Sequence, residues 1–390
     1  PGGHHGGDRH AAIGRAARKM NGEPSVYAVV AGGGTAGHTV PGLAIGAELA
    51  RRGRSAVLFV GSERGVEREM VPDAGFEVVL LPGRGIQRRL TLENVRSLLG
   101  IARAVLTSFS LLRRTRPRIV VAMGGYASVP CSVAAFLLRI PIVVAEQNAV
   151  PGLANRITAR FARASAVSFP DTGLPREVVT GNPVRPEMLD VDRVDGRDRA
   201  QQRLGIEPGR QLLVVYGGSL GALRINEAVL AAVDLLASRG DLAIRHVVGS
   251  RDHPTLSPRV PEPEPDGLQY QMVEFERDMP TVLEGADLVL SRAGATSVAD
   301  FAALGVPSVL VPLPGAPGDH QTANARVMAD AGAAVLLPND QVSGTRIAEL
   351  ATTLLHDRGR LSAMSRAAAD LGRRDAAALV ADLVEANARD

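Results

Sequence analysis

Short apolar runs alternate along the chain with longer amphipathic stretches, and this alternation predicts parallel βαβ units. The runs expected to form strands in the first half are residues 26–31, 56–60, 77–81, 119–123 and 142–145. The charged residues 190–202 are expected to form a connector, after which the pattern starts again. The strands expected in the second half are residues 212–216, 245–248, 288–290 and 308–311. Residues 254–267 are expected to be an exposed proline-rich loop and residues 343–387 an alanine-rich helix. The restart predicts two doubly wound α/β domains.

Both halves open in the same way, with a strand, a glycine-rich loop and the start of a helix. Residues 32–37 take this place in the first half and residues 217–222 in the second. A third glycine pair, Gly124-Gly125, precedes Tyr126 and also follows a predicted strand. Glycines let backbone N–H groups approach a phosphate, and a helix N-terminus adds about half a positive charge. One such loop can be a plain tight turn, but three of them at strand ends predict a phosphorylated ligand.

The composition is that of a globular protein with two or three domains. The chain has 390 residues, of which 45% are apolar and 22% charged, and these values argue against a disordered, collagen-like or coiled-coil protein. Cys131 is the only cysteine, so we expect neither an intramolecular disulfide nor a cysteine-based metal site, and a reducing cytoplasm is favoured. The D-x-D sequence of Asp190 and Asp192 follows no apolar strand, so no metal is expected there.

The longest uncharged run, residues 119–138, is not expected to span a membrane. Gly124, Gly125 and Pro130 divide it into a strand, a loop and a helix. Residues 1–23 are rich in glycine and histidine and lack the apolar core of a signal peptide. We therefore expect them to form a disordered leader.

Polar side chains of the first half follow the predicted strand ends. His38 begins the helix after the first glycine loop. There the helix dipole favours the neutral imidazole that a general base needs, although a first-turn histidine can equally cap or pack. Glu146, Gln147 and Asn148 follow a predicted strand at the edge where open parallel sheets bind ligands. Arg185 closes this half and could hold a phosphate or form a salt bridge.

The second half carries two further polar groups after predicted strands. Asp300 lies one turn into the helix that follows residues 291–297. Its carboxylate could accept hydrogen bonds from two ribose hydroxyls, or simply favour the helix dipole. His320, Gln321 and Asn324 begin another predicted helix and suit the hydroxyls of a sugar, although such side chains are commonly solvated.

Seven motifs follow one another along the chain: Gly33-Gly34-Thr35-Ala36-Gly37-His38, Gly124-Gly125-Tyr126, Glu146-Gln147-Asn148, Gly181-Asn182-Pro183-Val184-Arg185, Gly217-Gly218-Ser219-Leu220-Gly221-Ala222, Arg292-Ala293-Gly294-Ala295, and His320-Gln321 with Asn324. In this order they closely resemble the motifs of one family, the bacterial glycosyltransferases that add N-acetylglucosamine (GlcNAc) from UDP-GlcNAc to lipid I, undecaprenyl-pyrophosphoryl-MurNAc-pentapeptide, and so make lipid II for peptidoglycan. The resemblance covers roughly residues 26–385. Each motif alone occurs in many nucleotide-sugar enzymes, whereas the ordered set is specific.

The resemblance implies an α/β protein of the GT-B fold, with two Rossmann-like domains facing a central cleft. Residues 24–185 would bind the acceptor and the membrane, residues 186–370 would bind UDP-GlcNAc, and a helix at 371–390 would pack back toward the first domain. The implied reaction is an inverting displacement, in which the MurNAc 4-hydroxyl attacks the anomeric carbon as UDP leaves. Fixed N–H dipoles would stabilise the leaving diphosphate, so the resemblance implies a hexosyltransferase with no metal and no cofactor.

The resemblance also implies roles for particular residues. His38 would be the catalytic base. The residues expected to bind the donor are Thr35, Gly218, Ser219, Gly221, Phe275, Glu276, Arg292, Asp300, His320, Gln321 and Asn324. The residues expected to bind the acceptor or line the cleft are Gly33, Gly34, Gly37, Gly124, Gly125, Tyr126, Asn148 and Arg185. Two positions depart from the family's usual sequence, because Ala36 replaces a glycine and Asp300 a glutamate.

Positive charge is concentrated in one part of the chain. Residues 84–118 hold nine arginines and one acid, which gives this segment a net charge of +8. The whole chain has a net charge of +3, so the residues outside this segment have a net charge of −5. Apolar residues are interleaved, which suits either an ordinary helix with a solvated basic face or a helix on a membrane surface. Each arginine near an anionic leaflet contributes about 1 kcal/mol. We expect peripheral attachment to the anionic inner leaflet, on the cytoplasmic face of the bacterial membrane. The residues expected to carry it are Arg84, Arg88, Arg89, Leu90 and Arg96.

Other functions fit parts of the pattern. Another GT-B glycosyltransferase would share the donor half, and a UDP-GlcNAc 2-epimerase of this architecture would need no acceptor. An NAD-dependent oxidoreductase would use the G-x-G-x-x-G of residues 32–37 with Glu63 on the ribose. No nucleic-acid partner is expected, since only 3% of the residues are aromatic and no tryptophan is present for base stacking.

Overall fold

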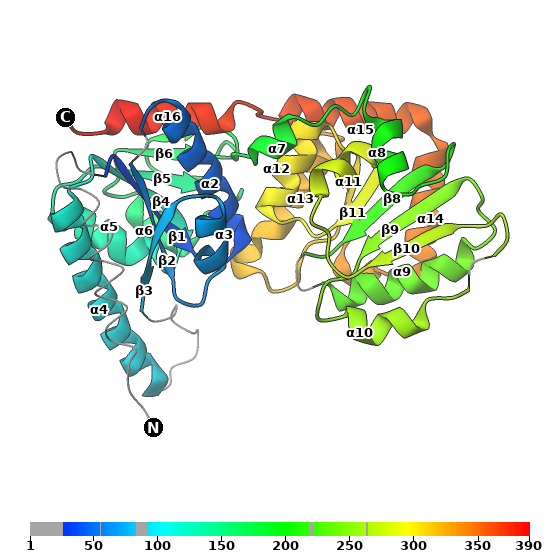
Figure 1. The fold of residues 1–390 in the computed structure, drawn as a ribbon, viewed down its shortest axis with the longest axis horizontal. Coiled ribbons are helices and arrows are strands. Elements are labelled where there is room, and N and C mark those ends of the chain that lie inside the picture. The colour runs from blue at the N-terminus through cyan, green and yellow to red at the C-terminus, as the bar shows by residue number, and fades with distance from the viewer. Residues whose placement is uncertain (1–25, 55, 83–91, 219–220, 263) are drawn as a thin grey trace. The chain divides into compact units, whose positions relative to one another are not determined.

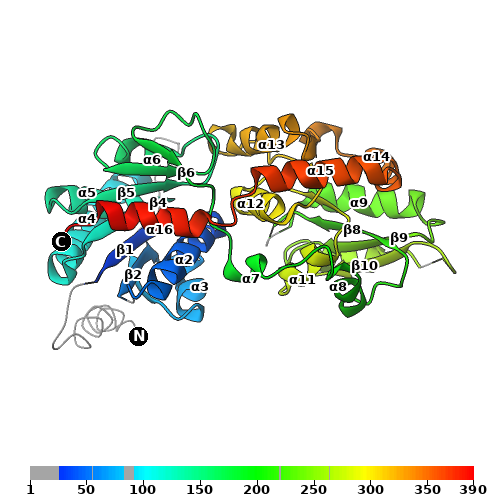
Figure 2. The same cartoon turned by 90° about the horizontal axis from the view of Figure 1, so that it is seen from above.

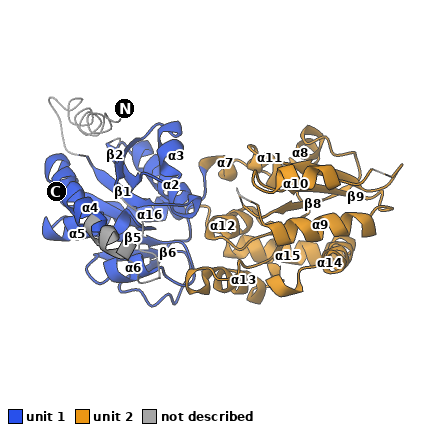
Figure 3. Ribbon diagram, turned by 90° about the horizontal axis from the view of Figure 1, so that it is seen from below, with its two compact units in different colours: residues 1–185, 375–390 blue, residues 186–374 orange. Residues whose placement is uncertain are grey.

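The computed structural model describes residues 26–54, 56–82, 92–218, 221–262 and 264–390, and only the backbone of residues 92–99. The expected leader, residues 1–23, lies outside the described residues, as do Arg84, Arg88, Arg89 and Leu90. The chain divides into two compact units, which are residues 1–185 with 375–390 and residues 186–374 (Figure 3). Each unit is built around one parallel sheet.

Unit 1 contains a seven-stranded sheet in the order β3-β2-β1-β4-β5-β6-β7 (Figure 1). Its strands are β1 (Ala28–Gly33), β2 (Val57–Ser62), β3 (Glu77–Leu81), β4 (Ile119–Gly125), β5 (Ile142–Glu146), β6 (Ala164–Val167) and β7 (Glu177–Val179). The central strands β1 and β4 consist of valine, alanine and other apolar residues and are buried along almost their whole length. Continuous apolar strands of this kind are typical of a parallel sheet covered on both faces.

Helices cover the two faces of this sheet. They are α2 (Ala36–Arg51), α3 (Glu67–Asp73), α4 (Leu92–Thr115), α5 (Ser128–Leu137), α6 (Leu153–Thr158) and α16 (Ala376–Asn387). Val29 of β1 joins an apolar cluster with Leu112 of α4, whereas the next residue, Val30, joins a second cluster with Ile45 of α2 and Val384 of α16. Neighbouring residues of a strand point to opposite faces, so two cores flank the sheet. Each buried leucine, isoleucine or valine contributes about 1.5–3 kcal/mol.

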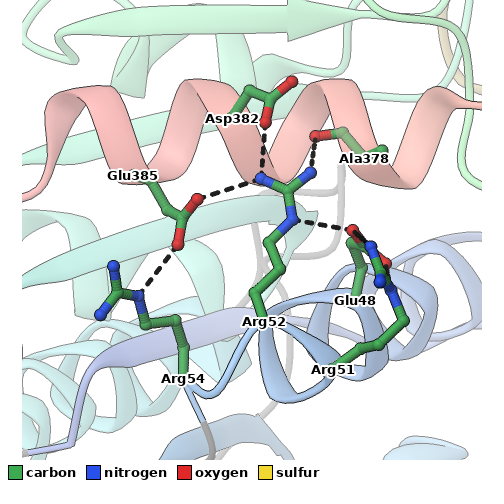
Figure 4. A network of polar contacts seen from close by, with 7 residues as sticks. All are labelled: Glu48, Arg51, Arg52, Arg54, Ala378, Asp382 and Glu385. Atoms are coloured by element: carbon green, nitrogen blue, oxygen red, sulfur yellow. Dashed lines mark hydrogen bonds and ion pairs between the residues drawn. The ribbon is translucent and has the colours of Figure 1, made fainter.

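The last helix, α16, belongs to unit 1 and lies across its strands (Figure 2). Arg52, the residue after α2, makes most of the polar contacts shown between α2 and α16 (Figure 4). The guanidinium donates to Asp382 at 2.5 Å, to Glu385 at 3.0 Å and to the carbonyl of Ala378 at 3.0 Å. Arg54 donates to Glu385 as well, at 2.9 Å. Charge-assisted bonds therefore join α16 to α2, although the two helices are far apart in the sequence.

Unit 2 contains a six-stranded parallel sheet in the order β10-β9-β8-β11-β12-β13. Its strands are β8 (Gln211–Tyr216), β9 (Leu242–Val247), β10 (Gln269–Val273), β11 (Leu288–Ser291), β12 (Ser308–Leu310) and β13 (Ala334–Leu336). Its helices are α7 (Pro186–Leu189), α8 (Arg197–Arg203), α9 (Leu223–Leu235), α10 (His253–Leu256), α11 (Met279–Gly285), α12 (Ala295–Leu304), α13 (His320–Asp330), α14 (Gly344–His356) and α15 (Arg358–Leu371). Short 3₁₀ turns are η1 (Ser257–Arg259), η2 (Pro317–Asp319) and η3 (Asn339–Gln341). Ile225 of α9 and Leu354 of α14 pack with Leu213 and Val215 of β8 in its main core.

The predicted α/β class is confirmed in both units, but some segment predictions are wrong. Residues 343–387 form three helices instead of one. The carboxylate of Asp357 accepts the N–H of Arg360 and caps the start of α15. The residue after α15 is Gly372, where a Cβ would lie 2.4 Å from the carbonyl oxygen of Ala302. The expected loop at 254–267 contains most of α10 and all of η1, and the expected connector at 190–202 contains most of α8. No helix of the described residues is long and apolar enough to span a bilayer.

Candidate functional site

Both sheets have a switch point, where the strand order runs in opposite directions on the two sides. It lies between β1 and β4 in unit 1 and between β8 and β11 in unit 2. Open parallel sheets bind ligands at such points, beyond the carboxyl ends of the strands. The glycine loops begin at the carboxyl ends of β1, β4 and β8. The predicted phosphate-binding loops therefore lie where this kind of sheet binds its ligands.

The two glycine loops of unit 1 lie against each other. The strand register pairs Gly32 with Gly124 and Gly33 with Gly125. A Cβ at Gly125 would lie 2.1 Å from the carbonyl oxygen of Gly33, and its φ is +75°. Gly34, at φ +101°, also has a backbone conformation that L side chains rarely adopt. Glycine is required at both positions, because a side chain would separate the loops or strain the turn.

His38 lies in the first turn of α2, beside both loops. Its Nδ1 atom is 3.3 Å from the hydroxyl oxygen of Thr35, the residue before the helix. A Cβ added at Gly124 would lie 3.1 Å from its Nε2 atom, so the imidazole rests on the backbone of the second loop. The structure thus brings together five of the residues predicted for catalysis and substrate binding: Thr35, His38, Gly34, Gly124 and Gly125.

Glu67, which the sequence analysis missed, lies on the inner side of the first glycine loop. Its side chain is 3% exposed. One carboxylate oxygen accepts the N–H of Gly34 at 2.5 Å and the hydroxyl of Thr39 at 3.0 Å, and the other accepts the N–H of Ser62 at 3.4 Å. Nothing in the pattern around residue 67 marks it, apart from Gly61 and Gly65 shortly before it.

Glu146 and Gln147 organise the loop after β5 instead of extending into solvent. Both are buried. The carboxylate of Glu146 accepts the N–H of Asn148 at 3.0 Å, the N–H of Gly152 at 3.0 Å and the side-chain amide of Asn155 at 2.9 Å. Asn155, which was not predicted, lies beside Gly124 as well. Asn148 is half-buried at the same sheet edge as the glycine loops.

Two predicted acceptor residues have different environments. The hydroxyl of Tyr126 donates to the carbonyl of Pro82 at 2.8 Å, and burial raises the pKa of this phenol. Tyr126 thereby fixes the chain at the end of β3. Arg185 is half-buried, and its Nε atom has no hydrogen-bond partner among the described residues.

In unit 2, a buried polar network supports the glycine loop after β8. Ser219 lies outside the described residues, whereas Gly218 and Gly221 have φ values of +104° and +83°. A Cβ at Gly221 would lie 2.1 Å from the carbonyl oxygen of Val248. Asn226 donates to that same carbonyl at 2.8 Å and to the carboxylate of Asp252 at 2.9 Å. Gly221, at the described end of this loop, is held closely against the end of β9.

Arg292 and Asn324 fix the turn between β11 and α12. Arg292 Nη1 donates to the carbonyls of Val311 and Pro312, at 3.2 and 3.0 Å, and to Asn339 Oδ1 at 2.8 Å. Burial lowers the pKa of this guanidinium, and its buried Nε atom has no hydrogen-bond partner among the described residues. The amide of Asn324 donates to the carbonyl of Ala293 at 3.2 Å. Arg292 of this turn and Asn324 of α13, both predicted to bind the donor, therefore lie close together.

The other predicted donor residues surround the same edge of this sheet. Glu276 forms an ion pair with Arg245 at 2.7 Å. The neighbouring Phe275 is 53% exposed. Gln321 accepts the N–H of Leu313 at 2.9 Å, and His320 Nδ1 lies 2.7 Å from the carbonyl oxygen of Pro317. Asp300 is buried within α12. Among the described residues, no three His, Cys, Asp or Glu side chains are grouped as a metal site would require.

Comparisons with known proteins agree with this architecture. Residues 28–167 match the glycosyltransferase family 28 N-terminal domain, and residues 212–380 match the glycosyltransferase family 28 C-terminal domain. In solved structures, the chain is similar to MurG of Acinetobacter baumannii, with a TM-score of 0.72 and 29% identity over 92% of this chain and 99% of that one. A putative UDP-N-acetylglucosamine 2-epimerase from Listeria monocytogenes, at 15% identity and a TM-score of 0.65 over 91% of this chain and 94% of that one, shares the fold alone. These matches confirm the predicted GT-B fold.

Relatives of known name extend over nearly the whole chain. One from Nocardioides sp. is 42% identical over 91% of this chain and 96% of its own length. One from Moorella thermoacetica is 39% identical over 88% of this chain and 94% of its own length. Both are named UDP-N-acetylglucosamine–N-acetylmuramyl-(pentapeptide) pyrophosphoryl-undecaprenol N-acetylglucosamine transferase. The chain therefore belongs to glycosyltransferase family 28 and, within it, to the family of these N-acetylglucosaminyltransferases.

Proposed function

We propose that the protein transfers GlcNAc from UDP-GlcNAc to the MurNAc 4-hydroxyl of lipid I, with inversion at the anomeric carbon, and so forms lipid II for peptidoglycan synthesis. The observation that carries this proposal is the Nocardioides relative, which is named as this N-acetylglucosamine transferase and is 42% identical over 91% of the chain. The placement of the predicted loops at the switch points of both sheets supports it.

Unit 2 is assigned to the donor. Its glycine loop and the N-terminus of α9 supply N–H groups and a positive dipole end for the UDP diphosphate. Arg292, held by three oxygen acceptors, would add a fixed cation beside it. The leaving diphosphate gains negative charge in the transition state, and donors fixed in advance stabilise that charge without reorganisation. Asp300 would accept the ribose hydroxyls, and His320, Gln321 and Asn324 would contact GlcNAc.

Unit 1 is assigned to the acceptor. The loops at Gly34 and Gly124 would bind the diphosphate of lipid I, with Asn148 and Arg185 contributing polar contacts. His38 would take the proton of the MurNAc 4-hydroxyl while that oxygen forms its bond to the anomeric carbon and the bond from that carbon to UDP breaks. The Nδ1 contact with Thr35 at 3.3 Å orients the imidazole for this role.

The same unit is proposed to meet the membrane. Five apolar side chains are exposed on α4, α5 and α6: Leu106 at 68%, Phe136 at 57%, Leu137 at 61%, Leu153 at 71% and Ile157 at 40%. In the structure, α5 packs against both α4 and α6. Arg103, Arg113 and Arg114 are exposed on α4, and the backbone of Arg96 lies in that helix as well. Exposed apolar groups beside arginines suit peripheral attachment to an anionic leaflet, proposed to be the cytoplasmic face of the bacterial membrane.

Sedimentation with anionic lipid vesicles tests the membrane proposal. Phe136→Ser is expected to weaken binding, because a ring that enters the lipid would be replaced by a polar group. Leu235→Ser, at a position of similar exposure on α9 of unit 2, is the matched control and should bind as the wild type does. Equal binding by all three proteins would contradict the assignment of this surface.

UDP release tests the reaction. With UDP-GlcNAc and a lipid I analogue, the protein is expected to release UDP, whereas UDP-GlcNAc alone should give no turnover. Conversion of UDP-GlcNAc alone into its 2-epimer would contradict the proposal and favour an epimerase. Release that needs a soluble aglycone and ignores the lipid I analogue would favour a different GT-B glycosyltransferase.

A further inference from the structure

Three glycines make room for the carboxylate of Glu67. A Cβ at Gly33 would lie 2.5 Å from Glu67 Cδ, one at Gly61 would lie 2.8 Å from Glu67 Cβ, and one at Gly65 would lie 1.8 Å from Glu67 Oε2. Gly33 is the last residue of β1, Gly61 lies near the end of β2, and Gly65 lies in the turn between β2 and α3. Any side chain at these positions would displace the carboxylate, so the local sequence is compatible with one placement of Glu67.

The hydrogen bonds of Glu67 reach both sides of the segment that carries His38. Its Oε1 atom accepts from Gly34, just before Thr35, and from Thr39, just after His38. The Thr39 hydroxyl also lies 3.1 Å from the carbonyl oxygen of Thr35, and the Thr35 hydroxyl oxygen lies 3.3 Å from His38 Nδ1. A small cavity of about 10 Å³ has His38, Thr39 and Glu67 in its lining. The carboxylate therefore constrains the backbone and, through Thr35, the imidazole.

We propose that Glu67 is a positioning residue of the acceptor site. By accepting the Gly34 N–H from the inner side of the loop, it fixes the loop and His38 in the arrangement that receives the acceptor diphosphate and the MurNAc hydroxyl. This inference rests on the proposed function. A small misplacement of a catalytic group can lower a rate by about a hundredfold, so a buried anchor of this kind has a measurable effect.

Variants at this position separate positioning from charge. Glu67→Gln retains an oxygen where Oε1 accepts from Gly34 and Thr39, whereas Glu67→Asp is one methylene shorter and Glu67→Ala has no acceptor. We expect Glu67→Ala and Glu67→Asp to lower kcat/KM for a lipid I analogue at least about tenfold, with KM for UDP-GlcNAc within about twofold of wild type. For Glu67→Gln, kcat/KM for the lipid I analogue should stay within about threefold of wild type. Glu69→Gln, on an exposed side chain of the same helix, is the matched control and should behave as wild type.

Each contrary outcome overturns the inference in a recognisable way. A folded Gln variant as impaired as Ala would assign the effect to the charge. A Glu67→Ala variant with wild-type kinetics would show that Glu67 has no positioning role. A Glu67→Ala variant with a lower KM for the acceptor would show that the carboxylate hinders acceptor binding at the Gly34 loop. Glu67 belongs to unit 1, so the amide signals of the other glycines of that unit, in ¹⁵N-glycine-labelled protein, report whether each variant is folded. Asp, which leaves a smaller void than Ala, replaces it if Ala does not fold.

The amide proton of Gly34 gives a second readout that needs no activity. In a ¹⁵N-glycine-labelled protein, the hydrogen bond to the Glu67 carboxylate is expected to shift the Gly34 amide proton signal downfield. Glu67→Ala and Glu67→Asp should move this signal upfield, whereas Glu67→Gln and Glu69→Gln should leave it unchanged. If the wild type is inactive on lipid I yet Gly34 responds in this way, the proposed function fails and the loop anchor stands. An active wild type whose Gly34 signal and kinetics ignore Glu67 would refute the anchor alone.

Discussion

His246 Nε2 lies 3.1 Å from Asn226 Oδ1 in the interior of unit 2. The other ring nitrogen, Nδ1, lies 2.8 Å from the hydroxyl oxygen of Tyr270, and the imidazole is fully buried. Asn226 in turn contacts the strand end that supports Gly221. A neutral histidine is thus part of the structure beneath the proposed donor loop.

The stability of unit 2 should fall in acid because of His246. Burial lowers the pKa of this imidazole to about 3 from an ordinary value of 6.5. The unfolded chain therefore binds a proton at a higher pH than the folded chain does. The free energy of unfolding should decrease from pH about 6.5 toward pH about 3, by at most about 1.4 kcal/mol for each pH unit. Urea unfolding between pH 7 and pH 5 measures this slope.

His246→Gln should reduce that slope, since glutamine does not titrate. His356→Gln, at an exposed position at the end of α14, is the matched control and should retain it. Parallel pH curves for the wild type and His246→Gln would contradict the prediction.

His38→Ala should reduce turnover strongly if the imidazole takes the acceptor proton. General-base catalysis contributes about 10²- to 10⁴-fold, so kcat with both substrates saturating should fall by that factor. KM for UDP-GlcNAc should change little, because the donor is assigned to unit 2. Turnover within a few-fold of wild type would remove His38 from this role.

Arg292→Lys should weaken donor binding although it preserves the charge. The planar guanidinium of Arg292 makes three contacts through Nη1, and among the described residues its Nε–H has no acceptor and could donate to the diphosphate. A lysine ammonium cannot do both. KM for UDP-GlcNAc is expected to rise about tenfold or more, with the KM for lipid I unaffected. Arg366→Lys, exposed on α15, is the control. An unchanged donor KM would place the diphosphate elsewhere.

Arg52→Ala should destabilise unit 1 by about 1–2 kcal/mol, because it removes charge-assisted bonds to Asp382 and Glu385 of α16. Arg51 is the matched control, since it bonds to Glu48 within its own helix and its side chain is 72% exposed. Arg51→Ala should therefore change the unfolding midpoint little. Equal effects of the two changes would show that α16 is held by its apolar face alone.

The sequence predicts the parts of the site that depend on local pattern. A glycine loop between an apolar strand and a helix can be recognised in the sequence, and β1, β4 and β8 end in the predicted loops. The short strands β6, β7, β10 and β13 could not be predicted in this way. β6, β7 and β10 mix polar with apolar residues within three to five positions, and β10 is half-buried throughout, whereas β13 is a three-residue apolar segment at the edge of its sheet.

Residues that act through tertiary contacts also escaped prediction. Glu67 looks like an ordinary acid at a helix start, and its role depends on Gly33 and Ser62, which belong to strands β1 and β2. Asn226 and His246 become partners only when α9 packs over β9. Glu146 and Tyr126, which the sequence predicts at the carboxyl edge of the sheet, also bond to nearby loops, and these tertiary contacts could not be predicted from the local pattern.

Analysis of the product tests the proposed transfer most directly. After incubation with UDP-GlcNAc and a lipid I analogue, the lipid-linked product should gain one GlcNAc, joined to the MurNAc 4-oxygen by a β linkage, in equal amount to the UDP released. An α linkage would contradict the single inverting displacement. UDP release without a GlcNAc-containing lipid product would contradict the transfer itself.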